Sequence, residues 1–111
     1  MDKKDNKEEI LKTLSNMSVD EIDHLRDTTT LQYKSILRKY YKTKDDLLVQ
    51  KFEKRRKLLD KGNSANKTEN LLRADQEIYL IKRKLIALSE VKKKLELELE
   101  ILGRFFWRAR V

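Results

Sequence analysis

The stretch that decides the fold is residues 30–62, TLQYKSILRKYYKTKDDLLVQKFEKRRKLLDKG. It contains no proline, and its single glycine comes last, so nothing in it stops a helix between Thr30 and Lys61. Five of its apolar residues recur at intervals of four and seven, an 11-residue pattern that keeps one narrow stripe along a nearly straight helix. These residues are Leu37, Tyr41, Leu48, Phe52 and Leu59. The stretch therefore predicts one long helix that packs through this stripe.

The segment Gly62-Asn63-Ser64-Ala65-Asn66 is the clear break in the helical pattern. Gly62 stands where a helix C-terminus favours a residue in the left-handed conformation. Thr68 is then expected to cap a second long helix. That helix carries a heptad seam with one three-residue slip, formed by Leu71, Ala74, Ile78, Ile81, Leu85, Leu88, Val91, Leu95, Leu99 and Leu102. Two long helices joined at this break predict a helical hairpin.

The residues before the long helix are acidic and predict two short helices. The first begins near Asn6, and the second is capped by Ser18 with a capping-box spacing. The threonine run 28–30 disfavours a helix interior and is expected to separate these helices from the next element. The predicted fold is therefore all-α. A short acidic N-terminal helical segment, residues 1–27, precedes a hairpin with a basic bend and a C-terminal assembly region, residues 28–111.

Composition excludes several classes of protein. The 111 residues include 41% charged side chains, two glycines, no proline and no cysteine. A compact all-β fold would need turn residues that are missing here. Without cysteine there can be no disulfide, iron–sulfur cluster, thiolate zinc site or thiol nucleophile. No apolar run is long enough to span a bilayer, and the charged N-terminus is no signal peptide, so we expect a cytoplasmic protein with no membrane partner.

Catalytic motifs are missing from the sequence as well. His24 is the only histidine, and no phosphate-cradling glycine loop or HExxH motif is present. The Asp45-Asp46 pair lies among lysines and suits helical ion pairing better than metal binding. We therefore expect no enzymatic activity, no cofactor and no metal site.

Positive charge is concentrated in the middle of the chain. The net charge of +8 arises from −3 in residues 1–30, +7 in residues 31–62 and +4 in residues 63–111. Such a concentration suggests a polyanionic partner, and nucleic acid is the expected one. The candidate DNA-binding residues are Lys51, Lys54, Arg55, Arg56, Lys57 and Lys61. The alternative is an exposed helix end stabilised by its dipole. Tyr33, Tyr40 and Tyr41 could supply stacking faces for bases, although Tyr41 also belongs to the apolar stripe.

The C-terminal leucines predict self-association. Residues 95–101 alternate apolar and polar residues, but their composition favours a helix over a strand. In a helix, Leu97 and Ile101 leave the heptad seam and form a second apolar face, which a monomeric hairpin would not bury. The tail after Gly103 places aromatic residues between arginines, and this composition is typical of oligomer interfaces. Alternatively, these aromatic residues could stack on bases or anchor the chain at a membrane surface. The candidate assembly residues are Leu95, Leu97, Leu99, Ile101, Leu102, Phe105, Phe106 and Trp107.

Three short motifs, in order, resemble the UvsY family of bacteriophage recombination mediators. They are Asp27-Thr28-Thr29-Thr30-Leu31-Gln32-Tyr33, the Lys54-Arg55-Arg56 cluster before Gly62, and Leu72-Arg73-Ala74-Asp75. The resemblance implies a non-enzymatic protein of the infected bacterial cytoplasm. Such a protein loads a RecA-like recombinase onto single-stranded DNA coated with single-strand-binding protein. It also implies a ring-like homo-oligomer of six or seven subunits, with Lys54 and Arg56 matching the family's strand-binding pair.

Two other functions remain open from the sequence. One is a non-catalytic helical scaffold or adaptor that oligomerises without specific nucleic-acid binding. The other is a duplex-DNA regulator with a helix-turn-helix in residues 7–27, which the acidic charge of that segment disfavours.

Overall fold

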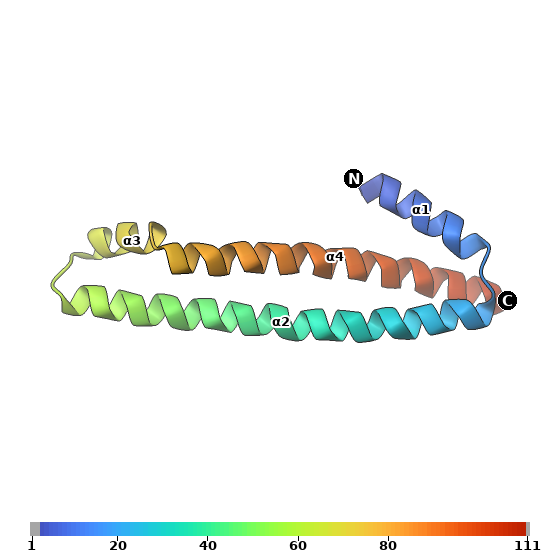
Figure 1. The fold of residues 1–111 in the computed structure, drawn as a ribbon, viewed down its shortest axis with the longest axis horizontal. Helices are drawn as coiled ribbons and strands as arrows, with labels where there is room; N and C mark the ends of the chain where they lie inside the picture. The colour runs from blue at the N-terminus through green and yellow to red at the C-terminus, as the bar shows by residue number, and fades with distance from the viewer. Residues whose placement is uncertain (1–2, 111) are drawn as a thin grey trace. The chain divides into compact units, whose positions relative to one another are not determined.

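The computed structural model describes the backbone of residues 3–110 and the side chains of residues 8–9 and 11–105. Within this backbone there are four helices and no strand (Figure 1). They are α1 (Lys3–Ser15), α2 (Val19–Asp60), α3 (Ala65–Arg73) and α4 (Gln76–Arg110). The two long helices, α2 and α4, form a hairpin, which confirms the predicted all-α architecture.

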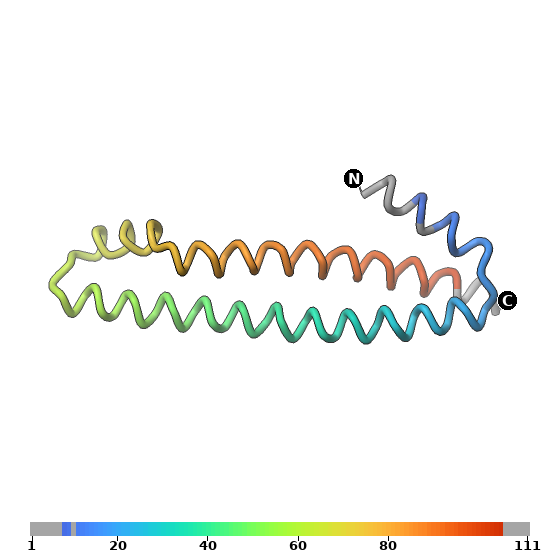
Figure 2. Tube along the Cα trace, viewed as in Figure 1, coloured from blue at the N-terminus to red at the C-terminus, as the bar shows by residue number. Residues whose placement is uncertain are grey.

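The chain divides into two compact units, each with its own core. The first unit comprises residues 1–36 and 91–111, and the second comprises residues 37–90. Figure 2 traces the second unit along the chain, from the later part of α2 through α3 into the beginning of α4. The candidate DNA-binding residues all belong to this second unit.

The threonine run lies inside α2 rather than before it. The Thr28 hydroxyl donates a hydrogen bond to the His24 carbonyl at 3.0 Å, and the Thr30 hydroxyl donates to the Arg26 carbonyl at 2.8 Å. Thr29 between them is buried. Because these two hydroxyls bond to carbonyls of their own helix, the run does not interrupt it. The second short helix expected from the sequence is thus the first part of α2.

The core of the first unit joins α1, the beginning of α2 and the end of α4. Leu14, Ile22, Ile101 and Leu102 are its buried residues. Partly buried side chains pack around them: Leu11, Met17, Leu25, Leu97 and Phe105. The alternating stretch 95–101 is helical, as predicted. The second apolar face that this helix creates is covered by α1, so one chain is enough to bury it.

The core of the second unit joins the later part of α2, α3 and the beginning of α4. Leu47, Leu72 and Ile78 are buried there. Leu58, Ile81 and Leu85 pack against them. α3 contributes Leu72 and therefore covers the end of the α2–α4 pair within this unit.

Two caps explain why the second long helix begins later than predicted. Ser64 caps α3, its Oγ accepting a hydrogen bond from the Lys67 amide at 3.2 Å. Asp75 caps α4, its Oδ1 accepting from the Ile78 amide at 3.0 Å. The prediction that Thr68 caps the long helix is wrong, because Thr68 is a buried residue inside α3.

The break after α2 is the one the sequence predicted. Gly62 has a φ of +91°, the left-handed conformation that glycine adopts without steric cost. Its amide donates a hydrogen bond to the Leu59 carbonyl at 2.9 Å, and the Asn63 amide donates to the Leu58 carbonyl at 3.3 Å. These bonds satisfy carbonyls at the end of α2 that the helix itself leaves open.

The prediction that the 11-residue stripe packs in the core is wrong for four of its five residues, since only Leu37 is partly buried. Tyr41, Leu48, Phe52 and Leu59 are all about half exposed or more, with Phe52 reaching 65%. The α2 residues that lie buried or partly buried in the second unit include Thr43, Leu47, Lys54 and Leu58 instead. Polar residues can occupy that inner side because Thr43 is small and Lys54 is neutralised by an ion pair. The apolar stripe consequently lies on the outer side of α2.

Candidate nucleic-acid interface

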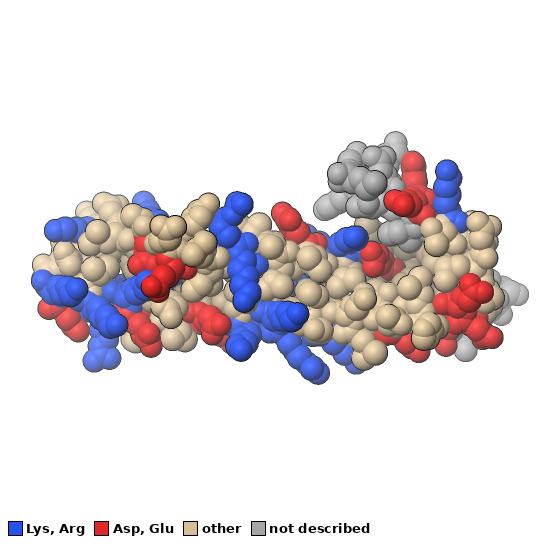
Figure 3. Space-filling model, viewed as in Figure 1, with Lys and Arg blue, Asp and Glu red and all other residues tan. Residues whose placement is uncertain are grey.

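The second unit carries most of the positive charge of the chain. It has 15 basic residues against 8 acidic residues, a net of +7, which leaves +1 for the first unit. Lys and Arg side chains extend along α2 on the face shown in Figure 3, interrupted by acidic side chains near α3. The basic cluster, residues 51–61, occupies the end of α2 and the residue after it. The second unit is therefore the one whose charge favours a polyanionic ligand.

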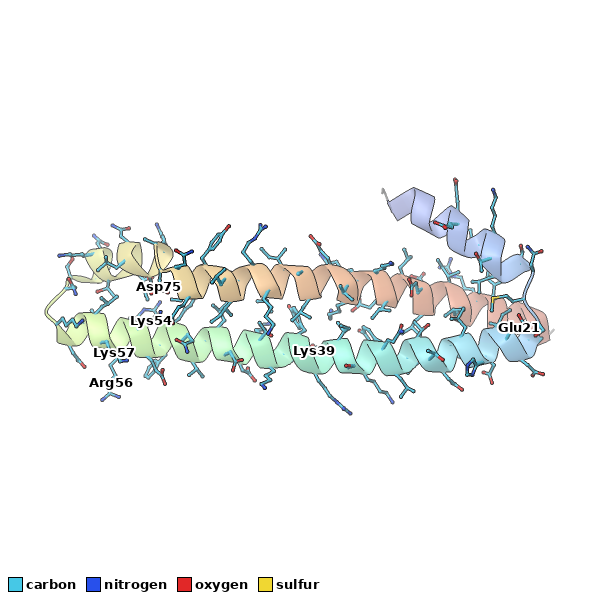
Figure 4. The ribbon with its side chains drawn as sticks, in the orientation of Figure 1. Glu21, Lys39, Lys54, Arg56, Lys57 and Asp75 are labelled. Carbon is cyan, nitrogen blue, oxygen red and sulfur yellow. The ribbon has the colours of Figure 1, made fainter. Side chains whose placement is uncertain are left out.

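Lys54 does not present its charge to solvent. Its side chain is 22% exposed, and its Nζ donates to Asp75 Oδ1 at 2.8 Å and to Asp75 Oδ2 at 2.9 Å. A third carboxylate oxygen, Oε2 of Glu77, lies 3.0 Å away. Figure 4 shows Lys54 and Asp75 pointing toward one another from α2 and the beginning of α4. Lys54 therefore ties two helices of the second unit together.

The protonation of this pair follows from its geometry. The hydrogen bond to Asp75 raises the pKa of Lys54 above its ordinary value of 10.5, although partial burial opposes the shift. The same hydrogen bond lowers the pKa of Asp75 below 3.8, and the Ile78 amide lowers it further. Both groups are charged at neutral pH, so Lys54 is neutralised in place by an acid that also caps α4.

Arg55 is engaged in a second ion pair. Its Nε donates to Glu69 Oε1 at 2.8 Å, which links α2 to α3. Both side chains remain partly exposed, so this pair contributes little to the free energy of unfolding. A phosphate could still approach the guanidinium, but it would have to compete with the carboxylate of Glu69.

The other four cations of the cluster are unpaired. Arg56, Lys57 and Lys61 are exposed, and Lys51 is half-buried. Among the residues whose side chains the structure describes, none makes a hydrogen bond or ion pair to the side-chain nitrogens of these four. Figure 4 shows Arg56 pointing away from the space between α2 and α4. Arg56, Lys57 and Lys61 are thus the predicted DNA-binding residues whose charge is available to a ligand.

The sequence could not show that Lys54 and Arg55 differ from their neighbours. Their partners Glu69, Asp75 and Glu77 lie 14 to 23 positions further along the chain, on α3 and α4. One signal was present, because an aspartate three residues before Ile78 is a typical helix N-cap. That signal would have placed the beginning of α4 at Gln76, although it would not have shown that Asp75 lies beside the basic cluster.

The tyrosines suggested as stacking faces have different surroundings. The Tyr33 hydroxyl donates to Glu96 Oε1 at 2.8 Å in the first unit. That bond, together with a stronger one from Lys92, lowers the pKa of Glu96. Tyr40 and Tyr41 belong to the second unit and contact each other edge to face, with ring centroids 5.3 Å apart. None of these contacts joins a tyrosine to the basic cluster.

The predicted assembly residues are partly accounted for within one chain. Leu95, Ile101 and Leu102 are buried, and Leu97 and Phe105 pack against the core of the first unit. Leu99 is half-buried. The side chains of Phe106 and Trp107 lie outside the described residues. The burial of these leucines therefore does not require a second subunit, and self-association stays a prediction.

The described part of the chain holds no group of three or more histidine, aspartate or glutamate side chains arranged to bind a metal ion. None of its helices combines the length and the apolar character needed to cross a membrane. The geometry and charge described above carry the functional argument, because comparisons with protein-family models, curated proteins and solved structures find no match to this chain.

Proposed function

We propose that this chain is a non-catalytic protein that binds single-stranded DNA through the unpaired cations at the end of α2. One observation supports this proposal above the others. In a unit of net charge +7, Arg56, Lys57 and Lys61 are exposed and no described acid neutralises them. When unpaired cations of a protein contact phosphates, they displace the counterions condensed on the DNA, and the release of these counterions drives binding.

The expected salt dependence follows from the number of free cations. With three phosphates neutralised per chain, the logarithm of the affinity should fall with the logarithm of salt concentration at a slope of about −0.7 × 3, near −2. If all six cluster residues took part, the slope would be about −4. Oligomerisation would multiply such weak contacts, because linked sites bind one strand at high effective concentration.

The finer role proposed is that of a recombination mediator. In this role the chain helps to load a RecA-like recombinase onto DNA coated with single-strand-binding protein. Support for it comes from the resemblance to the UvsY family, as does the proposed ring of six or seven subunits. Sedimentation equilibrium of the full chain tests the ring, and a monomer at micromolar concentration would contradict it.

A charge-matched pair of double variants tests the strand-binding site. Arg56→Ala with Lys57→Ala removes two of the exposed cations, while Lys82→Ala with Arg83→Ala removes two exposed cations from α4 in the same unit. Alanine is a good helix former, so both variants should keep their helical spectrum. We expect the first variant to lose about 25-fold in affinity for single-stranded DNA at 0.1 M salt and to flatten the slope by about 1.4. The Lys82→Ala, Arg83→Ala variant should show much smaller changes in affinity and in salt slope.

The readout is fluorescence anisotropy of a labelled oligonucleotide of about 15 nucleotides at several salt concentrations. Equal losses in the two variants would show that net charge, rather than a site on α2, governs binding. The same titration with duplex DNA separates a single-strand binder from a duplex-DNA regulator.

A second candidate function is a helical scaffold or adaptor. The observation in its favour is that Lys54 and Arg55 are held by carboxylates of α3 and α4, which is a structural use of the cluster. A scaffold should oligomerise and show no single-strand binding at moderate salt.

A further inference from the structure

Phe52 is an exposed aromatic residue at the edge of the unpaired cations. Its side chain is 65% exposed on the outer side of α2. It lines a hollow of about 250 Å³ together with Arg55, Arg56, Leu59 and Asp60. These positions are separated by three, four, seven and eight residues, so they share one face of a single helix. The hollow is therefore formed by α2 alone.

The apolar residues of this face, Phe52 and Leu59, are not part of the core of the second unit. Leu47 and Leu58 pack in that core and Lys54 pairs with Asp75 from the opposite side of the helix, while Arg55, at the edge of the hollow, pairs with Glu69 of α3. An aromatic ring left in water gives up the free energy that burial would provide. An exposed ring beside cations suits a ligand that offers both an apolar face and negative charge.

Charge decides which ligand fits the hollow. Arg55 and Arg56 both line it, against one acid, Asp60. A second copy of the chain packed through this face would bring another unit of net charge +7 against this one, and like charges oppose association. A strand of unpaired nucleotides instead carries phosphates for the cations and flat bases for the ring. Because Glu69 holds Arg55, Arg56 is the cation at the rim that is left for a phosphate.

We propose that Phe52 is a stacking platform for one unpaired base, with Arg56 contacting an adjacent phosphate. The inference rests on the proposed binding of single-stranded DNA and adds a source of selectivity to it. In a duplex both faces of each base are already stacked, so the ring has no partner there. The cations serve either form of DNA, whereas Phe52 favours the single strand.

The test compares Phe52→Leu with Tyr79→Leu. Both variants replace an exposed aromatic residue of the second unit with leucine, on α2 and on α4 respectively. Neither changes the charge or creates a cavity. We expect Phe52→Leu to weaken binding of a single-stranded oligonucleotide by about 5- to 150-fold, the range for losing one base–aromatic stack. Its salt slope and its affinity for duplex DNA should stay as in the unmodified protein. Tyr79→Leu should bind single-stranded DNA as the unmodified protein does. Phe52→Tyr keeps an aromatic ring at the position and should also bind as the unmodified protein does.

The outcomes separate this inference from the proposed function. If the unmodified protein binds single strands with the expected slope and Phe52→Leu binds them equally well, the stacking platform is refuted and the cation site stands. If Phe52→Leu reduces the sedimenting mass and leaves the affinity unchanged, the face is an interface between copies and the inference is wrong. If the unmodified protein binds no single-stranded DNA, the proposed function and this inference both fail.

Discussion

Asp75 performs two structural tasks that substitution can separate. Its Oδ1 accepts the Ile78 amide at 3.0 Å and so caps α4, and its carboxylate holds the Lys54 Nζ at 2.8 Å. Asp75→Ala removes the cap and the ion pair. Asp75→Asn keeps an oxygen that can accept from the amide, because asparagine is as good an N-cap as aspartate, but it removes the charge. The free energy of unfolding should fall in the order unmodified protein, Asp75→Asn, Asp75→Ala.

The size of the difference between the two variants follows from the cap. Loss of an N-cap costs about 1 kcal/mol, within a range of about 0.5–2 kcal/mol. For a small protein with a urea m-value of about 1–2 kcal/mol/M, the unfolding midpoint of Asp75→Ala should lie about 0.5–1 M below that of Asp75→Asn. Circular dichroism during urea titration at pH 7 measures both midpoints.

The pH dependence isolates the ion pair. Lys54, and then the Ile78 amide, lower the pKa of Asp75 in the folded chain below its ordinary value of 3.8. The stabilisation from the ionised carboxylate is therefore complete above pH 3.8 and is lost as the pH falls through the lower, folded-state pKa. At the alkaline end, the raised pKa of Lys54 means that its contribution is complete below pH 10.5 and is lost as the pH rises through the higher, folded-state pKa. The advantage of the unmodified protein over Asp75→Asn should shrink at both extremes.

Two results would refute this reasoning. Equal midpoints for Asp75→Asn and Asp75→Ala at pH 7 would show that the cap contributes nothing. A difference between the unmodified protein and Asp75→Asn that stays constant from pH 7 to well below 3.8 would show that the ion pair does not stabilise the fold.

Two further predictions concern packing and backbone conformation. Ile78→Ala should lower the free energy of unfolding by about 2–5 kcal/mol, because Ile78 is 1% exposed. Ile86→Ala, at an exposed position of the same helix, should change the free energy of unfolding by about 0.5 kcal/mol or less. Similar urea midpoints for the two variants would contradict the assigned core. Gly62→Ala should destabilise the chain by about 1 kcal/mol, because the φ of +91° at this position is unfavourable for alanine. Gly103→Ala should stabilise the chain by about 0.5–1 kcal/mol, because the position lies inside α4 and has open space for the new methyl group. Thermal unfolding measures both glycine variants, and shifts of the same sign would refute the argument.

The helices and the hairpin were predictable from the sequence because they depend on local signals. The absence of proline, the break at Gly62 and the helical spacing of leucines are each visible within a few turns of helix, whereas the second break, between α3 and α4, was missed. The face through which α2 packs was not predictable in the same way. The regular stripe through Leu48 and Phe52 is exposed, and the inner side accepts Lys54 because Asp75 comes to it from another helix.

The candidate site was predictable as a cluster and not as individual residues. Consecutive basic residues at 54–57 mark the end of α2 on composition alone. Whether each one is free depends on acids that tertiary structure brings near, and these neutralise Lys54 and engage Arg55 but leave Arg56 unpaired. The burial of Ile101 was likewise unpredictable, because it too depends on tertiary structure. Its burial against α1 depends on how the N-terminal helix docks, which the amphipathic pattern of that helix does not specify.

The core of the first unit also sets an order for folding during translation. Leu14 and Ile101 meet in that core, although 87 positions of sequence separate them. A ribosome that adds about 5–20 residues per second makes the second of these about 4–17 s after the first. The second unit, whose residues end at 90, can close while α1 still lacks its partner. Until Ile101 and Leu102 have been made, α1 has only the beginning of α2 to pack against, so the core of the first unit is the last part of the fold to be completed.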